Sequence, residues 1–129
     1  MNRIEALADA LSSKTAYADP QSEEYQCRNP LSLKAFLPQQ ERTDTGLRKF
    51  PNIEAGIKAC LYDLKIKCSG ISVANIKADS PIRRLIRCYS MPDHITSDVV
   101  EYLRKALDDD SITSDTPIAY FVEGKPNGK

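Results

Sequence analysis

The stretch NIEAGIKACLYDLKIK, residues 52–67, predicts the best-defined element of this chain, a helix capped by Asn52. Apolar residues recur along it at helical spacing: Ile53, Ile57, Cys60, Leu61 and Leu64. Lys65 and Lys67 fall in its last turn, where positive charge suits the helix dipole. Gly70 follows and is a plausible stop, because glycine readily adopts the left-handed conformation that ends many helices.

Three further segments have helical spacing of their apolar residues. The first begins at the capping-box sequence of residues 2–5, and the second begins at residues 80–81, a Ser-Pro dipeptide that favours a helix start. The third is capped by Thr96 or Ser97 and ends at the aspartate run 108–110, where negative charge opposes the dipole. The apolar faces are Ile4, Leu7, Ala8 and Leu11; Ile82, Leu85, Ile86 and Tyr89; and Val99, Val100, Leu103, Ala106 and Leu107.

The remaining segments are short or irregular. Residues 31–36 predict a helical turn opened by Pro30, residues 38–46 an exposed loop, and residues 117–122 a last short turn. No segment alternates at a period of two. The sequence therefore predicts a mainly α protein with four to five helices, formed by one domain over residues 1–123 and a flexible tail over 124–129.

Length and composition agree with one small globular domain. The chain has 129 residues, of which 41% are hydrophobic and 28% charged. Lysine plus arginine and aspartate plus glutamate are both 18, so bulk charge gives no reason to bind nucleic acid, and we expect no nucleic-acid partner. The apolar runs are too short for membrane insertion, and the N-terminus lacks the apolar core of a signal peptide. We expect a cytoplasmic or virion-associated protein.

The cysteines and the single histidine predict no metal site and no cofactor. Cys27, Cys60, Cys68 and Cys88 form no Cys-x-x-Cys pair, and His94 is the only histidine. We expect free, mostly buried thiols, with disulfides conceivable only if the protein is exported.

Two sets of polar residues are candidate sites. The first is the stretch 15–28, where Glu23 and Glu24 supply carboxylates and Tyr17 and Tyr25 supply rings that could stack on a sugar or a partner. Adjacent carboxylates diverge on a regular element, so a solvated loop is the simpler interpretation. The second group is the basic trio Arg83, Arg84 and Arg87, which could hold a phosphate, a carboxylate or an acidic surface, or simply face water.

Three stretches in order carry a resemblance to a family: residues 10–36, residues 50–64, and the segments from residue 80 to 122. The specific pieces are Asn29-Pro30 with Leu33, Phe50 with Glu54-Ala55-Gly56, and Asp115-Thr116-Pro117. Together they resemble the small lysozyme-like proteins of bacteriophages and prophages, which include muramidases and lytic transglycosylases. The resemblance implies a lysozyme-like helical fold, peptidoglycan as substrate, and a sugar-binding role near Asn29.

The departures from the family pattern concern its chemistry. Counting back from Asn29 without gaps, the family's glutamate position falls on Thr15 and the following glycine on Ala16. That glutamate is expected to act as the general acid, and a threonine hydroxyl is far too weak an acid to replace it. The family's Asn-Pro-Gly-Asn-Leu motif also has Leu31 and Ser32 in place of its glycine and second asparagine.

Three functions remain open at this point. The favoured hypothesis is a non-catalytic relative that binds a protein or peptidoglycan as a scaffold. The second is an active peptidoglycan glycosidase or lytic transglycosylase that uses Glu23 or Glu24; such an acid would lie half-buried in a cleft, and both side chains pointing into water would exclude it. The third is a small regulator or inhibitor of a host system.

Overall fold

The computed structural model describes residues 2–71, 76–89 and 91–122, so the predicted tail 124–129 lies outside the described residues. Within these ranges the protein is a small all-α domain, as predicted. The α-helices are α1 (Arg3–Ser12), α2 (Glu23–Gln26), α3 (Ile53–Cys68), α4 (Ile82–Cys88) and α5 (Thr96–Leu107). The 3₁₀ helices are η1 (Ala16–Ala18), η2 (Asp93–Ile95) and η3 (Ile118–Phe121). The described residues form only isolated β-bridges and no strand.

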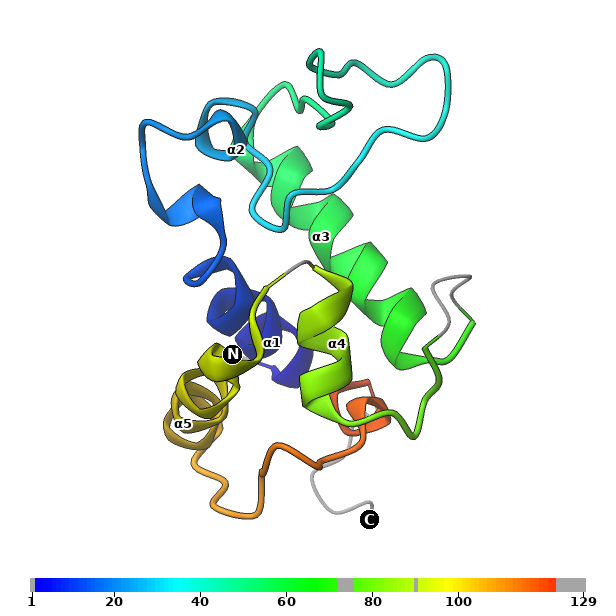
Figure 1. Ribbon diagram of the computed structural model, residues 1–129. Coiled ribbons are helices and arrows are strands. Elements are labelled where there is room, and N and C mark those ends of the chain that lie inside the picture. Colours follow the sequence, from blue (N-terminus) through cyan, green and yellow to red (C-terminus); the bar gives the residue numbers. More distant parts are fainter. Residues whose placement is uncertain (1, 72–75, 90, 123–129) are drawn as a thin grey trace.

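The elements form two lobes that α3 connects (Figure 1). One lobe contains α2 and the long loop that leads to α3, and the other contains α1, α4, α5 and η3. In the second lobe α1 packs against α5, α3 and η3, and α4 packs against α5. Because α3 belongs to both lobes, one of its faces is available to line the space between them.

Helix starts follow the local signals in the sequence. The Asn2 side chain accepts from the Glu5 backbone N–H at 2.8 Å, and the Glu5 carboxylate accepts from the Asn2 backbone N–H at 3.0 Å, which completes the predicted capping box. Asn52 accepts from the Ala55 backbone N–H at 2.8 Å at the start of α3. Gly70 has a φ of 76°, in the left-handed region expected after a helix end.

The prediction of which face α3 buries was partly wrong. The structure buries Gly56, Cys60, Leu64 and Cys68, four residues spaced by four. Ile57, which we predicted to be in the core, is 45% exposed. The physical reason is a contact with the loop before α3. The Arg28 carbonyl comes so close to α3 at Gly56 that this position, and those spaced by four from it, form the buried face.

The predicted helical turn over residues 31–36 was also wrong. Ser32 has a φ of 58°, and Lys34 pairs with Leu47 in an antiparallel bridge. The cause is Asn29, whose side-chain oxygen accepts from the Leu33 backbone N–H at 2.8 Å and whose side-chain nitrogen donates to the Leu33 carbonyl at 2.8 Å. These bonds occupy the backbone groups that a helical turn would need.

Two other helix starts differ in detail from the prediction. Pro81 is the N-cap of α4 instead of its first residue, because it pairs with Pro117 in a β-bridge. The Ser80 hydroxyl accepts from the Lys77 backbone N–H at 3.0 Å and does not cap the helix. α5 begins at Thr96 directly after η2, so neither Thr96 nor Ser97 caps it as predicted, and its N-cap is Ile95. Ala106, which we predicted on the buried face, is exposed. The helix is followed by Asp108, whose φ of 49° turns the chain into the predicted loop.

Candidate functional site

A cleft of about 1510 Å³ lies between the two lobes. One wall is built by the loop of residues 31–51 and by Glu24 of α2, and the other by the end of α4 with the segment that follows it. α3 forms the floor, and residues 14–16 at the end of α1 close one side. The cleft brings Thr15 and Glu24, from the first candidate region of the sequence, beside α3.

Thr15 lies in this cleft, directly after α1. Its side chain is 8% exposed, and its hydroxyl donates to the Pro30 carbonyl at 2.7 Å and lies 3.1 Å from the Ser12 carbonyl. The same oxygen accepts from the Tyr17 backbone N–H at 3.3 Å and caps η1. Thr15 therefore ties α1 to the loop at residue 30. A hydroxyl with this set of partners has no acidic proton to transfer to a ligand.

Asn29 is a structural clamp in this fold. It is fully buried, and besides its bonds to Leu33 its side-chain nitrogen donates to the Arg48 carbonyl at 2.9 Å. It therefore joins the two arms of the loop that walls the cleft. The structure does not place its side chain in the cleft as a ligand-binding group, as the resemblance had suggested.

Gly56 allows this loop to approach α3. A Cβ atom at position 56 would lie 1.9 Å from the Arg28 carbonyl oxygen and 3.5 Å from Cδ of Pro30. Nearby, the Phe50 backbone N–H donates to the Cys27 carbonyl at 3.0 Å. The pieces Asn29-Pro30, Phe50 and Gly56, which are far apart in sequence, thus form one contact region beside Thr15.

The two candidate glutamates have different surroundings. Both lie in α2, which the Ser22 hydroxyl caps. Glu24 is half-buried and lines the cleft, where its carboxylate accepts from the Ser32 hydroxyl at 3.3 Å. Glu23 is exposed outside the cleft and accepts from the hydroxyls of Thr43 and Thr45. Only Glu24 is placed where it could meet a ligand.

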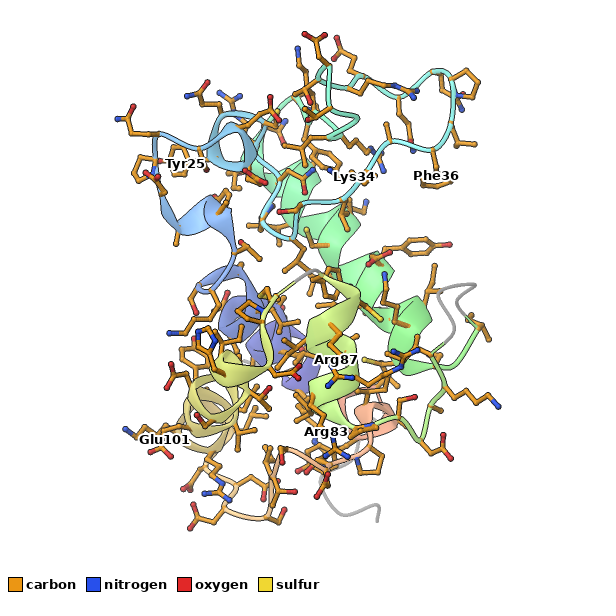
Figure 2. All side chains as sticks on the ribbon, viewed as in Figure 1. Tyr25, Lys34, Phe36, Arg83, Arg87 and Glu101 are labelled. Atoms are coloured by element: carbon orange, nitrogen blue, oxygen red, sulfur yellow. The ribbon has the colours of Figure 1, made fainter. Side chains whose placement is uncertain are left out.

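The tyrosines predicted as binding residues contact each other. The ring centroids of Tyr17 and Tyr25 lie 5.4 Å apart with an interplanar angle of 32°. Burial, together with the nearby Tyr25 phenol, raises the pKa of Tyr17. Neither ring lines the cleft, and Figure 2 shows Tyr25 on α2, at the edge of the lobe. Their contact joins η1 to α2.

The predicted arginine trio lies on α4, outside the cleft (Figure 2). Arg83 pairs with Asp115, and Arg87 forms a two-pronged pair with Asp93 at 2.8 and 2.7 Å. The hydrogen bond from Arg87 lowers the pKa of Asp93. Arg84 is half-buried. Arg83 and Arg87 therefore have carboxylate partners within the chain, and Asp115 of the Asp-Thr-Pro piece serves as one of them.

A hydrogen-bonded cluster that the sequence did not predict lies on the cleft floor. The Tyr89 hydroxyl donates to the Asp63 carboxylate at 2.6 Å, and Lys67 pairs with the same oxygen. Burial, with the Asp63 carboxylate next in importance, raises the pKa of Tyr89 well above its usual range. The cluster joins α3 to the end of α4. The four-residue spacing of Asp63 and Lys67 could have indicated the ion pair, but nothing local indicates Tyr89.

The charge of the cleft was likewise not predicted from the sequence. Seven of its lining residues are basic, and three are acidic: Lys14, Lys34, Arg48, Lys49, Lys58, Lys65 and Lys67 against Glu24, Glu41 and Asp63. Two strongly exposed rings, Phe36 at 75% and Tyr62 at 67%, also line it. Figure 2 shows Lys34 and Phe36 on the loop of the lobe that contains α2. A neutral chain thus carries a basic cleft with aromatic rings.

The four cysteines are free, as expected, and Cys27, Cys60 and Cys68 are buried. Burial raises the pKa of both Cys60 and Cys68 to about 12, which makes these thiols poor nucleophiles. Among the described residues, no group of three His, Cys, Asp or Glu side chains is placed to hold a metal ion. None of the helices in the same ranges has the length and apolar character needed to cross a membrane.

Comparison with known protein families, with curated proteins and with solved structures gives no match for this chain.

Proposed function

We propose that this protein is a lysozyme-like binding protein of phage or prophage type that has lost the catalytic acid and uses its cleft to hold a ligand without cleaving it. The observation that carries the proposal is Thr15. It lies in the cleft at the end of α1, where the resemblance expects a glutamate, and its hydroxyl is hydrogen-bonded to the Pro30 carbonyl at 2.7 Å.

The contact region around Thr15 supports the resemblance independently of the missing acid. Asn29 holds the loop, Gly56 lets that loop reach α3, and Phe50 bonds to the loop's backbone. The resemblance rests on these same residues, and each has a geometric reason to be present. In this proposal Asn29, Gly56 and Phe50 still hold the cleft walls in place. Thr15, at the position that would supply the proton, only holds the wall together.

A second candidate function follows from Glu24, which is half-buried and faces the cleft. A glycosidase could use it as the general acid in place of the residue at position 15. Its contact with the Ser32 hydroxyl argues against this role. The Ser32 hydroxyl holds this carboxylate against the cleft wall, whereas a general acid must present its proton to the glycosidic oxygen of a ligand.

The test is release of muropeptides from purified peptidoglycan by the wild-type chain, Thr15→Glu and Thr15→Gln. We expect no release by the wild type. Glutamine is uncharged and similar in size to glutamate, so Thr15→Gln is the matched control. Gain of activity in Thr15→Glu but not in Thr15→Gln would support both the lysozyme-like fold and the loss of the catalytic acid at position 15. Release by the wild type, abolished in Glu24→Gln, would contradict the proposal and establish the glycosidase instead.

A further inference from the structure

We propose that the ligand of the cleft is an acidic polypeptide segment, held in an extended conformation along α3. This inference rests on the proposed function, since it names the class of ligand that a non-catalytic cleft would take. It goes beyond the sequence, whose equal numbers of acidic and basic residues predict no preference for an anion.

The cleft has a net positive charge because its seven basic residues outnumber its three acidic residues, Glu24, Glu41 and Asp63. Two of its lysines have carboxylate partners: Lys67 pairs with Asp63, and Lys14 pairs with Asp98. In contrast, Lys34, Lys49, Lys58 and Lys65 are all exposed, and within the described ranges none of the four is in an ion pair. Four solvated ammonium groups in one concave surface produce a local field that attracts carboxylates.

The floor of the cleft has a regular pattern that suits an extended chain. Lys58, Tyr62 and Lys65 are separated by four and three residues, so they lie on one face of α3. The two lysines are about 10 Å apart along the helix axis, roughly the length of three residues of an extended peptide. Tyr62 lies between them, and Phe36 reaches into the same cleft from the loop. This arrangement matches acidic residues that flank an apolar one.

The overall charge of the chain favours a short acidic peptide over a nucleic acid. Lysine plus arginine and aspartate plus glutamate are both 18, so the cations of the cleft are balanced by acidic residues elsewhere in the chain. A nucleic acid carries a charge on every nucleotide and would extend beyond the cleft, where those acidic residues repel it. A short acidic segment meets only the cations of the cleft. A protein segment is therefore favoured over single-stranded nucleic acid.

The experiment measures binding by fluorescence anisotropy with the full chain. The probe is a fluorescein-labelled peptide in which glutamates flank phenylalanines, and the comparison probes are the same peptide with glutamines and a fluorescein-labelled oligothymidylate. We expect the acidic peptide to bind at least about tenfold more tightly than either, with affinity that weakens as salt rises. Equal binding of the glutamine peptide, or tighter binding of oligothymidylate, would overturn the inference.

Charge reversal locates the binding surface. We expect Lys58→Glu combined with Lys65→Glu to weaken binding about tenfold or more, since each exposed pair is worth roughly a factor of two to five. Lys77→Glu is the matched control, because Lys77 is equally exposed but lies outside the cleft. We expect it to change the Kd less than about twofold. Equal loss in the control and in the cleft variant would contradict binding in the cleft.

The variants change only exposed side chains, and circular dichroism checks that they fold. Lys58→Ala and Lys65→Ala form a second series that removes each charge without reversing it. We expect them to weaken binding of the acidic peptide, but by less than the glutamate substitutions. Failure of the acidic peptide to bind, with no muropeptide release by the wild type, overturns this inference alone. Muropeptide release by the wild type overturns the proposed function, whichever way the peptide behaves.

Discussion

Replacing Gly56 by alanine tests the close approach of the loop after α2 to helix α3. The new Cβ atom would lie 1.9 Å from the Arg28 carbonyl oxygen, whereas real Cβ atoms essentially never come nearer than 3.0 Å to such a neighbour. The loop and α3 must therefore separate by about 1 Å. The obstacle is backbone, and the neighbouring bond from the Phe50 N–H to the Cys27 carbonyl restrains that backbone.

The magnitude follows from two opposing effects. Forcing an atom into a well-packed contact costs about 3 kcal/mol when backbone has to move. Alanine in a helix is about 1 kcal/mol more favourable than glycine. We therefore expect Gly56→Ala to lower the free energy of unfolding by about 2 kcal/mol, which corresponds to a fall in Tm of roughly 8 °C for a domain of this size.

Urea unfolding followed by far-ultraviolet circular dichroism measures this change. Ile57→Ala is the matched control, because it introduces alanine at the next position of the same helix, where the side chain is largely exposed. We expect the control to stay within about 1 kcal/mol of the wild type. If Gly56→Ala equals or exceeds the stability of the wild type with an unchanged m-value, the close contact between the loop after α2 and α3 does not exist.

Three further predictions concern buried polar groups. Asn29→Ala should lower stability by about 3 kcal/mol in urea unfolding, because three backbone groups lose their partner; a loss below about 1 kcal/mol would contradict the clamp. Tyr89→Phe should lower the free energy of unfolding by about 1–2 kcal/mol, and this loss should largely vanish in an Asp63→Ala background, where the hydroxyl has no acceptor at position 63. Burial raises the pKa of Cys60 and Cys68 from 9.0 to about 12, so between these pH values the unfolded thiols ionise while the folded ones stay neutral. Stability should then fall as pH rises above 9, by up to about 1.4 kcal/mol per pH unit and thiol, and alanine at both positions should flatten this part of the pH profile.

The sequence by itself determined the start of α1 and both ends of α3. The capping box at residues 2–5, Asn52 before α3 and Gly70 after it all function as predicted. Each of these signals acts between groups three or four residues apart, so the local chain contains both partners. The apolar spacing of α5 similarly identified its buried residues Val99, Val100 and Leu103.

The tertiary structure alone decided which groups meet across the chain. The buried row of α3 begins at Gly56 because the Arg28 carbonyl crosses there, and residues 31–36 are extended because Asn29 joins Leu33 to Arg48, which is 19 residues away. The basic cleft has the same origin. Its lysines come from the end of α1, the loop and α3, and only folding brings them to one concave surface. The composition gives a net charge of zero because it counts every charged residue without regard to position. The attraction of a ligand depends on the distances from that ligand to each charge, and these distances are set by the fold.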